Sequence, residues 1–126
     1  MTQTILIVDD DDMIRELVAY ILQMSQYAVV EATDGQDALH KLNYSNIDLI
    51  ITDLRMPIMD GLELIQSLRN NRNYKGIPII LYSADIDNAF DAINSNARAD
   101  KYLNKTTNTK TLLAHISQLI SPMAYN

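Results

Sequence analysis

The chain has 126 residues and a hydrophobic content of 48%, which matches one globular domain with a single core. It contains no cysteine, so disulfides, thiol chemistry and zinc–thiolate sites are excluded. The formal net charge of −6 opposes binding to nucleic acid or to anionic lipid, and we expect neither as a partner.

The first residues do not resemble an export signal. Residues 1–4 carry no basic side chain, and the apolar run over residues 5–8 is too short for a signal-peptide core or a membrane span. We therefore expect a cytoplasmic protein. Its length predicts one domain over residues 1–121, followed by a short tail over residues 122–126.

Five short apolar runs alternate with segments of helical pattern. The predicted strands cover residues 4–8, 28–32, 48–52, 78–82 and 101–104. In the first helix Ile14, Val18 and Leu22 recur at helical spacing, and the turn at Asp34 and Gly35 opens the second. Apolar residues within 64–68, 89–93 and 112–120 mark the third, fourth and fifth helices.

Three of the predicted strands contain unbroken apolar runs, at residues 5–8, 49–51 and 79–81, which is typical of strands covered by helices on both faces. Strand–helix alternation favours a parallel sheet, because parallel neighbours need a crossover connection. We predict a doubly wound α/β domain with five parallel strands in the flavodoxin-like order 2-1-3-4-5 and helices on both faces.

Polar side chains follow the ends of four predicted strands. Asp9 and Asp10 follow the first strand, Asp53 the third and Lys105 the fifth, and Ser83 lies at the end of the fourth. In an open parallel sheet these strand ends share one edge, where such folds bind their ligands. The sequence therefore predicts one polar site built from all five residues.

Three carboxylates at one edge repel each other unless one is protonated or a cation neutralises them. Carboxylate oxygens suit Mg²⁺, with Mn²⁺ as the alternative ion, and such a metal also bridges to phosphate oxygens. A carboxylate can attack phosphorus to form an aspartyl phosphate. Phosphoryl transfer otherwise needs a cation on the transferred group, a hydroxyl donor and in-line geometry, so the set fits this chemistry.

Each of these residues could also have a purely structural role. Acidic residues favour helix N-termini, and we assign Asp11 and Asp12 to that role, whereas we assign Asp9 and Asp10 to the metal. Alone, a serine at a strand end or a lysine after one carries no function. His40 and the other histidine, His115, are expected on exposed helix faces, with no metal-ligand spacing between them.

The same residues carry a family resemblance. The segments Ile7-Val8-Asp9-Asp10, Asp53-Leu54-Arg55-Met56-Pro57-Ile58-Met59-Asp60-Gly61 and Ser83-Ala84, followed by Lys105, resemble the receiver domains of two-component response regulators. The resemblance covers nearly the whole chain at family spacing. Because little follows the fifth helix, the chain is similar to the single-domain, chemotaxis-regulator type.

The resemblance implies a phosphorylation-activated signalling switch that is not an enzyme beyond its own phosphoryl transfer and dephosphorylation. Asp53 matches the phosphoacceptor, loaded from the phosphohistidine of a sensor histidine kinase or phosphotransfer protein. Asp10 and Asp53 match direct magnesium ligands, Asp9 a ligand through water, and Arg55 a ligand through its backbone carbonyl. Lys105 matches the lysine that pairs with the phosphoryl group.

The resemblance also implies a conformational output. Ser83 matches the hydroxyl that moves toward the phosphoryl group, and Tyr102 the aromatic side chain that turns inward in response. The surface of the fourth helix, fifth strand and fifth helix would then contact an unknown downstream protein. The expected assembly state is a monomer or a weak dimer.

Two departures from the family pattern concern this signalling surface. Thr106 follows Lys105 where the family usually has proline, so we expect a trans peptide bond. With a trans bond, we expect Lys105 to lie farther from Asp53 in the resting state. Arg98 replaces a common glycine in the loop before the fifth strand.

Three other functions compete with this one. The first is an interaction module that keeps the fold but works without phosphorylation; the five competent site residues count against it. A phosphatase with an aspartate nucleophile usually has an acid two residues later, where Arg55 stands. A flavin carrier needs backbone amides and hydroxyls to bind the flavin phosphate, whereas the loop at residues 9–12 is acidic.

We also expect an ion pair between Arg55 and Asp85 across the mouth of the site.

Overall fold

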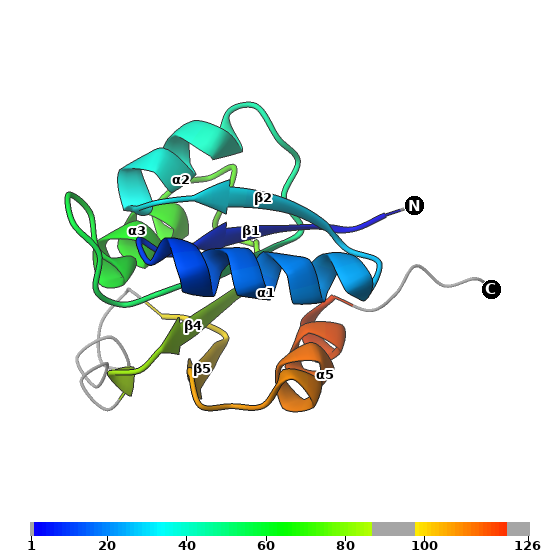
Figure 1. Cartoon of the computed structure of the whole chain (residues 1–126). Coiled ribbons are helices and arrows are strands. Elements are labelled where there is room, and N and C mark those ends of the chain that lie inside the picture. Colours follow the sequence, from blue (N-terminus) through cyan, green and yellow to red (C-terminus); the bar gives the residue numbers. More distant parts are fainter. Residues whose placement is uncertain (1, 87–97, 121–126) are drawn as a thin grey trace.

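The computed structural model describes residues 2–86 and 98–120. It contains one five-stranded parallel sheet in the order β2-β1-β3-β4-β5, which confirms the predicted topology (Figure 1). The strands are β1 (Thr4–Val8), β2 (Ala28–Ala32), β3 (Leu49–Thr52), β4 (Ile79–Ser83) and β5 (Lys101–Asn104). β3 begins one residue later than predicted, and β4 lies one residue further along the chain.

The helices are α1 (Asp12–Met24), α2 (Gly35–Leu42), α3 (Gly61–Arg69) and α5 (Thr109–Leu119). The predicted fourth helix and the predicted tail lie outside the described residues. Within the described ranges, no helix combines the length and the apolar character that crossing a bilayer would need.

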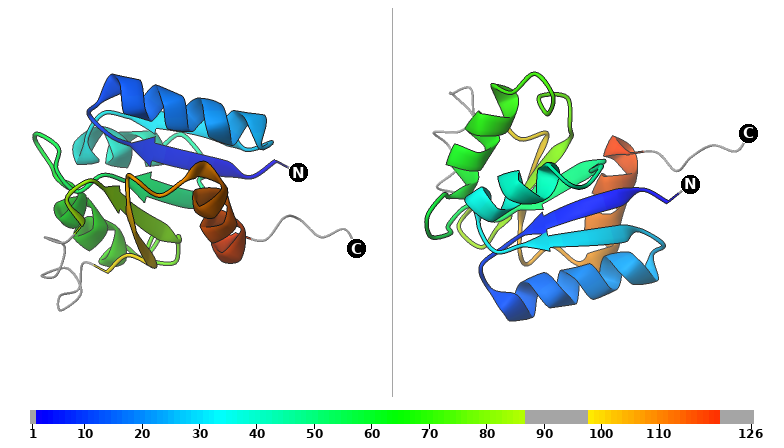
Figure 2. Two further views of the ribbon diagram at one scale, coloured as in Figure 1. Left: turned by 60° about the horizontal axis from the view of Figure 1, so that its bottom comes forward. Right: turned by 90° about the horizontal axis from the view of Figure 1, so that it is seen from above.

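The helices cover both faces of the sheet, and strand alternation separates the two cores. Ile5 and Ile7 of β1 pack with residues of α1 and α5, including Val18 and Leu112. Leu6 and Val8 face the other way, into a cluster with residues of α2 and α3. The views in Figure 2 show α1 on one side of the sheet and α2 and α3 on the other. Burial on both faces explains the unbroken apolar runs.

Side-chain caps fix where the helices begin, beside the carboxyl ends of the strands. Asp11 caps α1, Asp34 caps α2 and Asn108 caps α5, each accepting a hydrogen bond from a backbone N–H of the first turn. Asp60 forms a reciprocal capping box with Glu63 in α3. These caps hold the connecting loops at the edge where the polar residues gather.

The loop from β3 to α3 is tightly constrained. Gly61 N donates to Leu54 O at 2.8 Å, and a Cβ on Gly61 would collide with the backbone carbonyl of Asp53. Ile58 has a φ of 68°, while Met59 N donates to Pro57 O at 2.7 Å across it. A β-branched residue in this left-handed region is strained, and its side chain is exposed.

The loop before β5, where Arg98 departs from the family pattern, is held through its backbone. The side chain of Arg98 is exposed, and its carbonyl accepts a hydrogen bond from Arg69 Nε at 2.9 Å. Arg69 also donates to the carbonyl of Ile77 and pairs with Asp100 at 2.9 Å. This arginine of α3 therefore ties together the starts of β4 and β5.

Replacing Ile58 by glycine should stabilise the protein by about 1 kcal/mol, because relief of the left-handed strain exceeds the extra unfolded-state entropy of glycine. Chemical denaturation of both proteins measures the change. The Ile58→Ala variant removes the same exposed side chain but keeps a Cβ, so its gain should be smaller. Equal stability of Ile58→Gly and the wild type would show that the loop stores no strain.

Candidate functional site

Three carboxylates meet at the carboxyl edge of the sheet. Asp9 and Asp10 follow β1, Asp53 follows the neighbouring β3, and one carboxylate oxygen from each lies within 4.8 Å of the others. The hydrogen bonds between the parallel strands β1 and β3 continue into the site, since Asp53 N donates to Val8 O at 2.9 Å. Asp9 is buried and Asp10 is exposed, so the cluster opens to solvent on one side.

Lys105 joins two of these carboxylates. Its Nζ lies 2.7 Å from Asp9 Oδ2 and 2.9 Å from Asp53 Oδ2. No peptide bond among residues 2–86 and 98–120 is cis, so the bond to Thr106 is trans, as expected. The expectation that a trans bond keeps Lys105 away from Asp53 was wrong. Lys105 lies in a turn in which Thr106 N donates to the Asn104 side chain at 2.9 Å and Thr107 N donates to the Asn104 carbonyl at 2.8 Å. From this turn the lysine reaches both carboxylates without a proline after it.

The electrostatics of the cluster follow from burial and from this ion pair. Burial raises the pKa of the Asp9 carboxyl, and the hydrogen bonds from Lys105 and from Asp11 N only partly oppose the effect. Burial alone would lower the pKa of Lys105. Its contacts with Asp9 and Asp53 outweigh that effect and hold its pKa above the ordinary value. The ammonium therefore stays charged between the two carboxylates.

The donor set fits a divalent cation. Three carboxylates and one ammonium leave two formal negative charges, which a divalent cation neutralises. Hard oxygen donors of this kind, with an open side for water, are the environment that Mg²⁺ prefers. The predicted clustering of Asp9, Asp10 and Asp53 is thus present in the structure.

The remaining predicted residues lie on β4, on β5 and in the loop after β3. Ser83 is buried at the end of β4, and its Oγ accepts a hydrogen bond from Asp85 N at 3.1 Å. Tyr102 is half-buried on β5, and its hydroxyl accepts a hydrogen bond from Ala99 N at 3.0 Å. The expected ion pair is present, with Arg55 Nε 2.6 Å from Asp85 Oδ2.

Arg15, which was not predicted as a site residue, supports the acidic loop through its side chain. Its guanidinium is buried and donates to the carbonyl of Asp9 at 2.8 Å, to Glu31 at 2.9 Å and to Asp12 at 2.7 Å. The signal was present, because Arg15 lies three residues before Val18 on the buried face of α1. An arginine at a buried position needs hydrogen-bond acceptors for its guanidinium, and the acidic loop provides two of them.

The expected exposure holds for one histidine and fails for the other. His40 is exposed on α2, whereas His115 is only partly exposed on α5 and its Nδ1 is buried. Leu112 and Ile116, which precede and follow it on α5, are core residues, so His115 lies at the border of the buried face of this helix.

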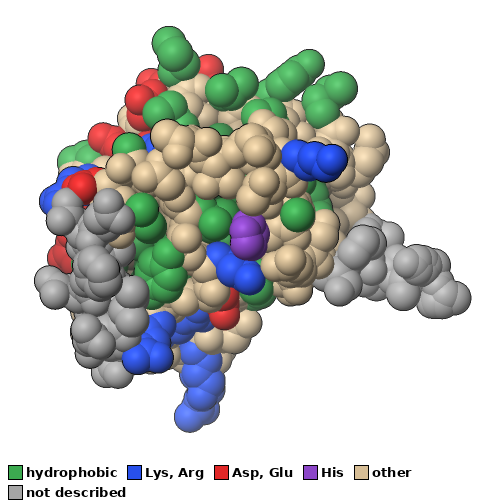
Figure 3. All heavy atoms as spheres, turned by 90° about the horizontal axis from the view of Figure 1, so that it is seen from below, with side chains coloured by type: hydrophobic (Ala, Val, Ile, Leu, Met, Phe, Trp, Pro, Cys, Tyr) green, Lys and Arg blue, Asp and Glu red, His purple; other side chains and the backbone are tan. Residues whose placement is uncertain are grey.

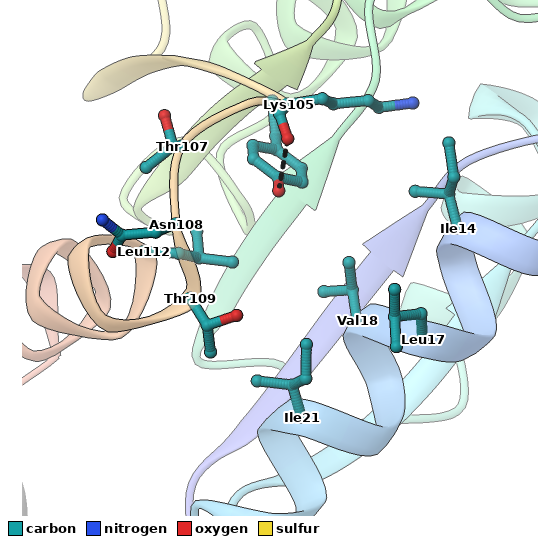
Figure 4. A pocket seen from close by; sticks show the side chains of 10 residues that line it. Ile14, Leu17, Val18, Ile21, Lys105, Thr107, Asn108, Thr109 and Leu112 are labelled. Carbon is teal, nitrogen blue, oxygen red and sulfur yellow. Dashed lines mark hydrogen bonds between the residues drawn. The ribbon is translucent and has the colours of Figure 1, made fainter.

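A cavity of about 340 Å³ lies between α1 and the loop from β5 to α5. Its walls include Ile14, Val18 and Leu112, and Figure 4 shows the Lys105 side chain extending toward the side on which Ile14 lies. The Lys105 carbonyl accepts a hydrogen bond from Tyr82 at 3.4 Å beside the cavity. The cavity thus flanks the carboxylate cluster and does not contain it.

Comparison with known proteins agrees with this architecture. The family model of the response regulator receiver domain matches residues 5–117. The chain belongs to this family, which defines it as a receiver domain of two-component signalling. The chemotaxis response regulator CheY4 of Vibrio cholerae is 32% identical with a TM-score of 0.85, covering 95% of this chain and 100% of that one.

Other relatives show the breadth of the family. Response regulator GtcR of Aneurinibacillus migulanus is 35% identical over 100% of this chain, which spans 51% of that protein. The CAI-1 autoinducer sensor kinase/phosphatase CqsS of Vibrio cholerae is 44% identical over 64% of this chain and 12% of its own length. The chain therefore spans about half or less of these curated relatives, which include both a regulator and a kinase.

Removing the Arg15 guanidinium should lower the free energy of unfolding by about 2–3 kcal/mol, because three charge-assisted hydrogen bonds are lost around a buried position. Arg15→Ala and Arg15→Lys, compared by urea denaturation, test this. Lysine keeps the charge but not the planar fork, so it should recover only part of the loss. Full recovery by lysine would show that charge alone, and not the three-way contact, holds the loop.

Proposed function

We propose that this chain is a phosphorylation-activated signalling switch in which Asp53 receives a phosphoryl group from the phosphohistidine of a sensor histidine kinase or phosphotransfer protein. The observation that carries the proposal is the contact of Lys105 Nζ with both Asp9 and Asp53. It joins the charged groups that phosphoryl transfer needs in one small, partly buried site.

Asp53 is oriented for attack by two fixed contacts. Leu54 N donates to its Oδ1 at 2.7 Å, while Oδ2 faces Lys105. In the transfer, a new bond forms between a carboxylate oxygen of Asp53 and phosphorus, and the nitrogen–phosphorus bond of the donor breaks. The imidazole leaves with that electron pair, and Lys105 offsets the charge on the transferred group.

Asp10 and Asp53 would hold Mg²⁺ directly, Asp9 through water, and Arg55 through its backbone carbonyl, with Mn²⁺ as the alternative. The ion would neutralise charge on the phosphoryl oxygens. Response regulator TrrA of Thermotoga maritima, solved in complex with Mg²⁺ and BeF, is 35% identical with a TM-score of 0.84 and supports a magnesium-dependent site. The similarity covers 94% of this chain and 100% of the TrrA chain.

Phosphorylation would then act through Ser83 and Tyr102. Ser83 would leave Asp85 N for the phosphoryl group, and Tyr102 would leave Ala99 N and turn inward. Both residues belong to the half of the sheet beside α5, so the change reaches the surface of the predicted fourth helix, β5 and α5, which an unknown partner would contact. On this account the chain is a cytoplasmic switch that catalyses only its own phosphorylation and dephosphorylation.

Asp53→Asn should abolish labelling by a small phosphodonor in the presence of Mg²⁺, because asparagine is not a nucleophile. A phosphate-affinity gel measures the labelling, and Asp60→Asn, an equal charge change at a helix cap, should label normally. Undiminished labelling of Asp53→Asn would contradict the assignment. Absence of labelling in the wild type would favour a phosphorylation-independent interaction module.

Magnesium should stabilise the folded protein, because only folding brings Asp9, Asp10 and Asp53 together. At about 100 times the dissociation constant, linkage predicts roughly 2.7 kcal/mol, and Asp10→Asn should greatly reduce this gain. Asp11→Asn is the matched control, since it removes one charge from the same loop and asparagine caps helices equally well. Melting curves that do not respond to magnesium would contradict the metal site.

Arg55→Ala should shorten the lifetime of the aspartyl phosphate, because the ion pair with Asp85 restricts the water that hydrolyses it. Stability should change by only about 0–1 kcal/mol, since the pair is exposed. Decay rates of Arg55→Ala, Asp85→Ala and the double variant measure the role. If the pair acts as a unit, the double variant decays no faster than either single variant. An unchanged decay rate in all three variants would show that the ion pair does not affect the lifetime of the aspartyl phosphate.

A further inference from the structure

The Lys105 side chain is held in one direction, which is uncommon for a lysine. Its stem of four carbons is flexible, and ordering it costs rotamer entropy. Figure 3 shows several Lys and Arg side chains that project from the molecular surface, the usual position of such groups. The Lys105 side chain is instead only 14% exposed, and its Nζ contacts two carboxylates. An ammonium held in this way needs a backbone that points its stem toward the site.

The backbone of Lys105 lies in a turn that Asn104 closes twice. The Asn104 carbonyl accepts a hydrogen bond from Thr107 N at 2.8 Å, which makes residues 104–107 a β-turn with Lys105 and Thr106 at its centre. The Asn104 side chain accepts a second hydrogen bond, from Thr106 N at 2.9 Å, in the pattern of an Asx-turn. One residue therefore supplies both acceptors within the bend that follows β5.

Two further contacts hold the peptide units on either side of Lys105. Lys105 N donates to Ser83 O at 3.2 Å, so the pairing of β4 and β5 continues one residue beyond Asn104. The Tyr82 hydroxyl donates to Lys105 O at 3.4 Å, a longer and weaker contact that the dashed line in Figure 4 marks. The bonds to Asn104 are thus the contacts made within the bend itself.

The side-chain bond of Asn104 depends on which residue follows Lys105. Thr106 is exposed, and it takes part in the turn through its backbone N–H. Proline has no backbone N–H, so a proline at position 106 could not form this bond. The departure from the family pattern and the asparagine before the lysine therefore belong together, because Asn104 binds the group that a proline would lack.

We propose that Asn104 is a positioning residue for Lys105: its side chain fixes the trans turn from which the lysine ammonium reaches Asp9 and Asp53. This inference rests on the proposed phosphoryl transfer to Asp53, in which Lys105 offsets charge on the transferred group. Asn104 acts on the reaction only through the lysine. A group misplaced by about 1 Å can lower a rate by up to about a hundredfold, so a loosened turn has a measurable effect.

The rate of phosphorylation by acetyl phosphate, at saturating Mg²⁺, tests the role. Asn104→Ala should slow the labelling of Asp53 about tenfold, because the bend loosens and the ammonium leaves its two contacts. Asn104→Asp keeps an oxygen that accepts the bond from Thr106 N, so it should recover most of the wild-type rate. Failure of the aspartate to restore any of the rate would contradict a role for this hydrogen bond.

Asn108→Ala is the matched control in the same loop. Asn108 accepts a bond of similar length, 2.8 Å, from Thr111 N and caps α5. Its truncation should lower the melting temperature through loss of the cap but leave the labelling rate unchanged. Equal slowing by Asn108→Ala and Asn104→Ala would show that general loosening of the loop, and not Asn104, sets the rate.

A double variant tests whether Asn104 acts through the lysine. In a Lys105→Ala background, Asn104→Ala should cause no further slowing, because the group that it positions is already gone. The same fold-loss in both backgrounds would overturn the proposal, since it would show that Asn104 affects the reaction by a separate route.

Trace acetylation of the lysines by acetic anhydride, followed by mass spectrometry, tests the positioning without any phosphoryl transfer. Exposed Lys110 is the internal reference. Lys105 should react slowly in the wild type and in Asn108→Ala, and several times faster in Asn104→Ala, where the two carboxylates no longer hold it. That result in a protein that accepts no phosphoryl group would support the positioning role while the proposed function fails. Unchanged reactivity of Lys105 in Asn104→Ala would overturn the inference.

Discussion

The ion pairs of Lys105 with Asp9 and Asp53 are the interaction on which the site depends. Three carboxylates at one sheet edge would otherwise repel each other, and burial already raises the pKa of Asp9. The single ammonium lowers this repulsion and leaves a residual charge that suits a divalent cation. The site is thus only partly compensated, and in the proposed function its remaining negative charge would attract the metal ion.

Several features of the fold hold the residues of this site in place. Parallel strands bring residues separated by up to 96 positions to one edge, and helix caps fix the loops that carry them. Gly61 allows the loop before α3 to pass against the backbone of Asp53, and Arg15 donates a hydrogen bond to the carbonyl of Asp9. Ile58 accepts a strained conformation within the same loop. The carboxylate cluster is therefore held in place by its surroundings.

Much of this was predictable from the sequence, for physical reasons. The parallel sheet follows from the unbroken apolar runs and from strand–helix alternation, and its strand order was taken from the flavodoxin-like fold. The clustering of Asp9, Asp10 and Asp53 follows from the shared edge of parallel strands. That Lys105 belongs to the site was predicted from its place after the fifth strand. Its contact with Asp53 in the resting state was not, because the trans bond to Thr106 was expected to keep the lysine away. Arg15 was not predicted, because the helical pattern is carried by apolar residues and a charged residue on the buried face of α1 falls outside that pattern. The partly buried position of His115 depends on its packing beside α5 core residues, which its polar character did not reveal.

The central claim is that Asp53, among these carboxylates, is the one that reacts. Site mapping tests it most directly: the wild-type protein is treated with a small phosphodonor and Mg²⁺, the acyl phosphate is reduced with borohydride, and the peptides are sequenced by mass spectrometry. Our account predicts that the residue at position 53 alone is converted to homoserine. Conversion at position 9 or 10, or no conversion while Mg²⁺ is bound, would contradict it.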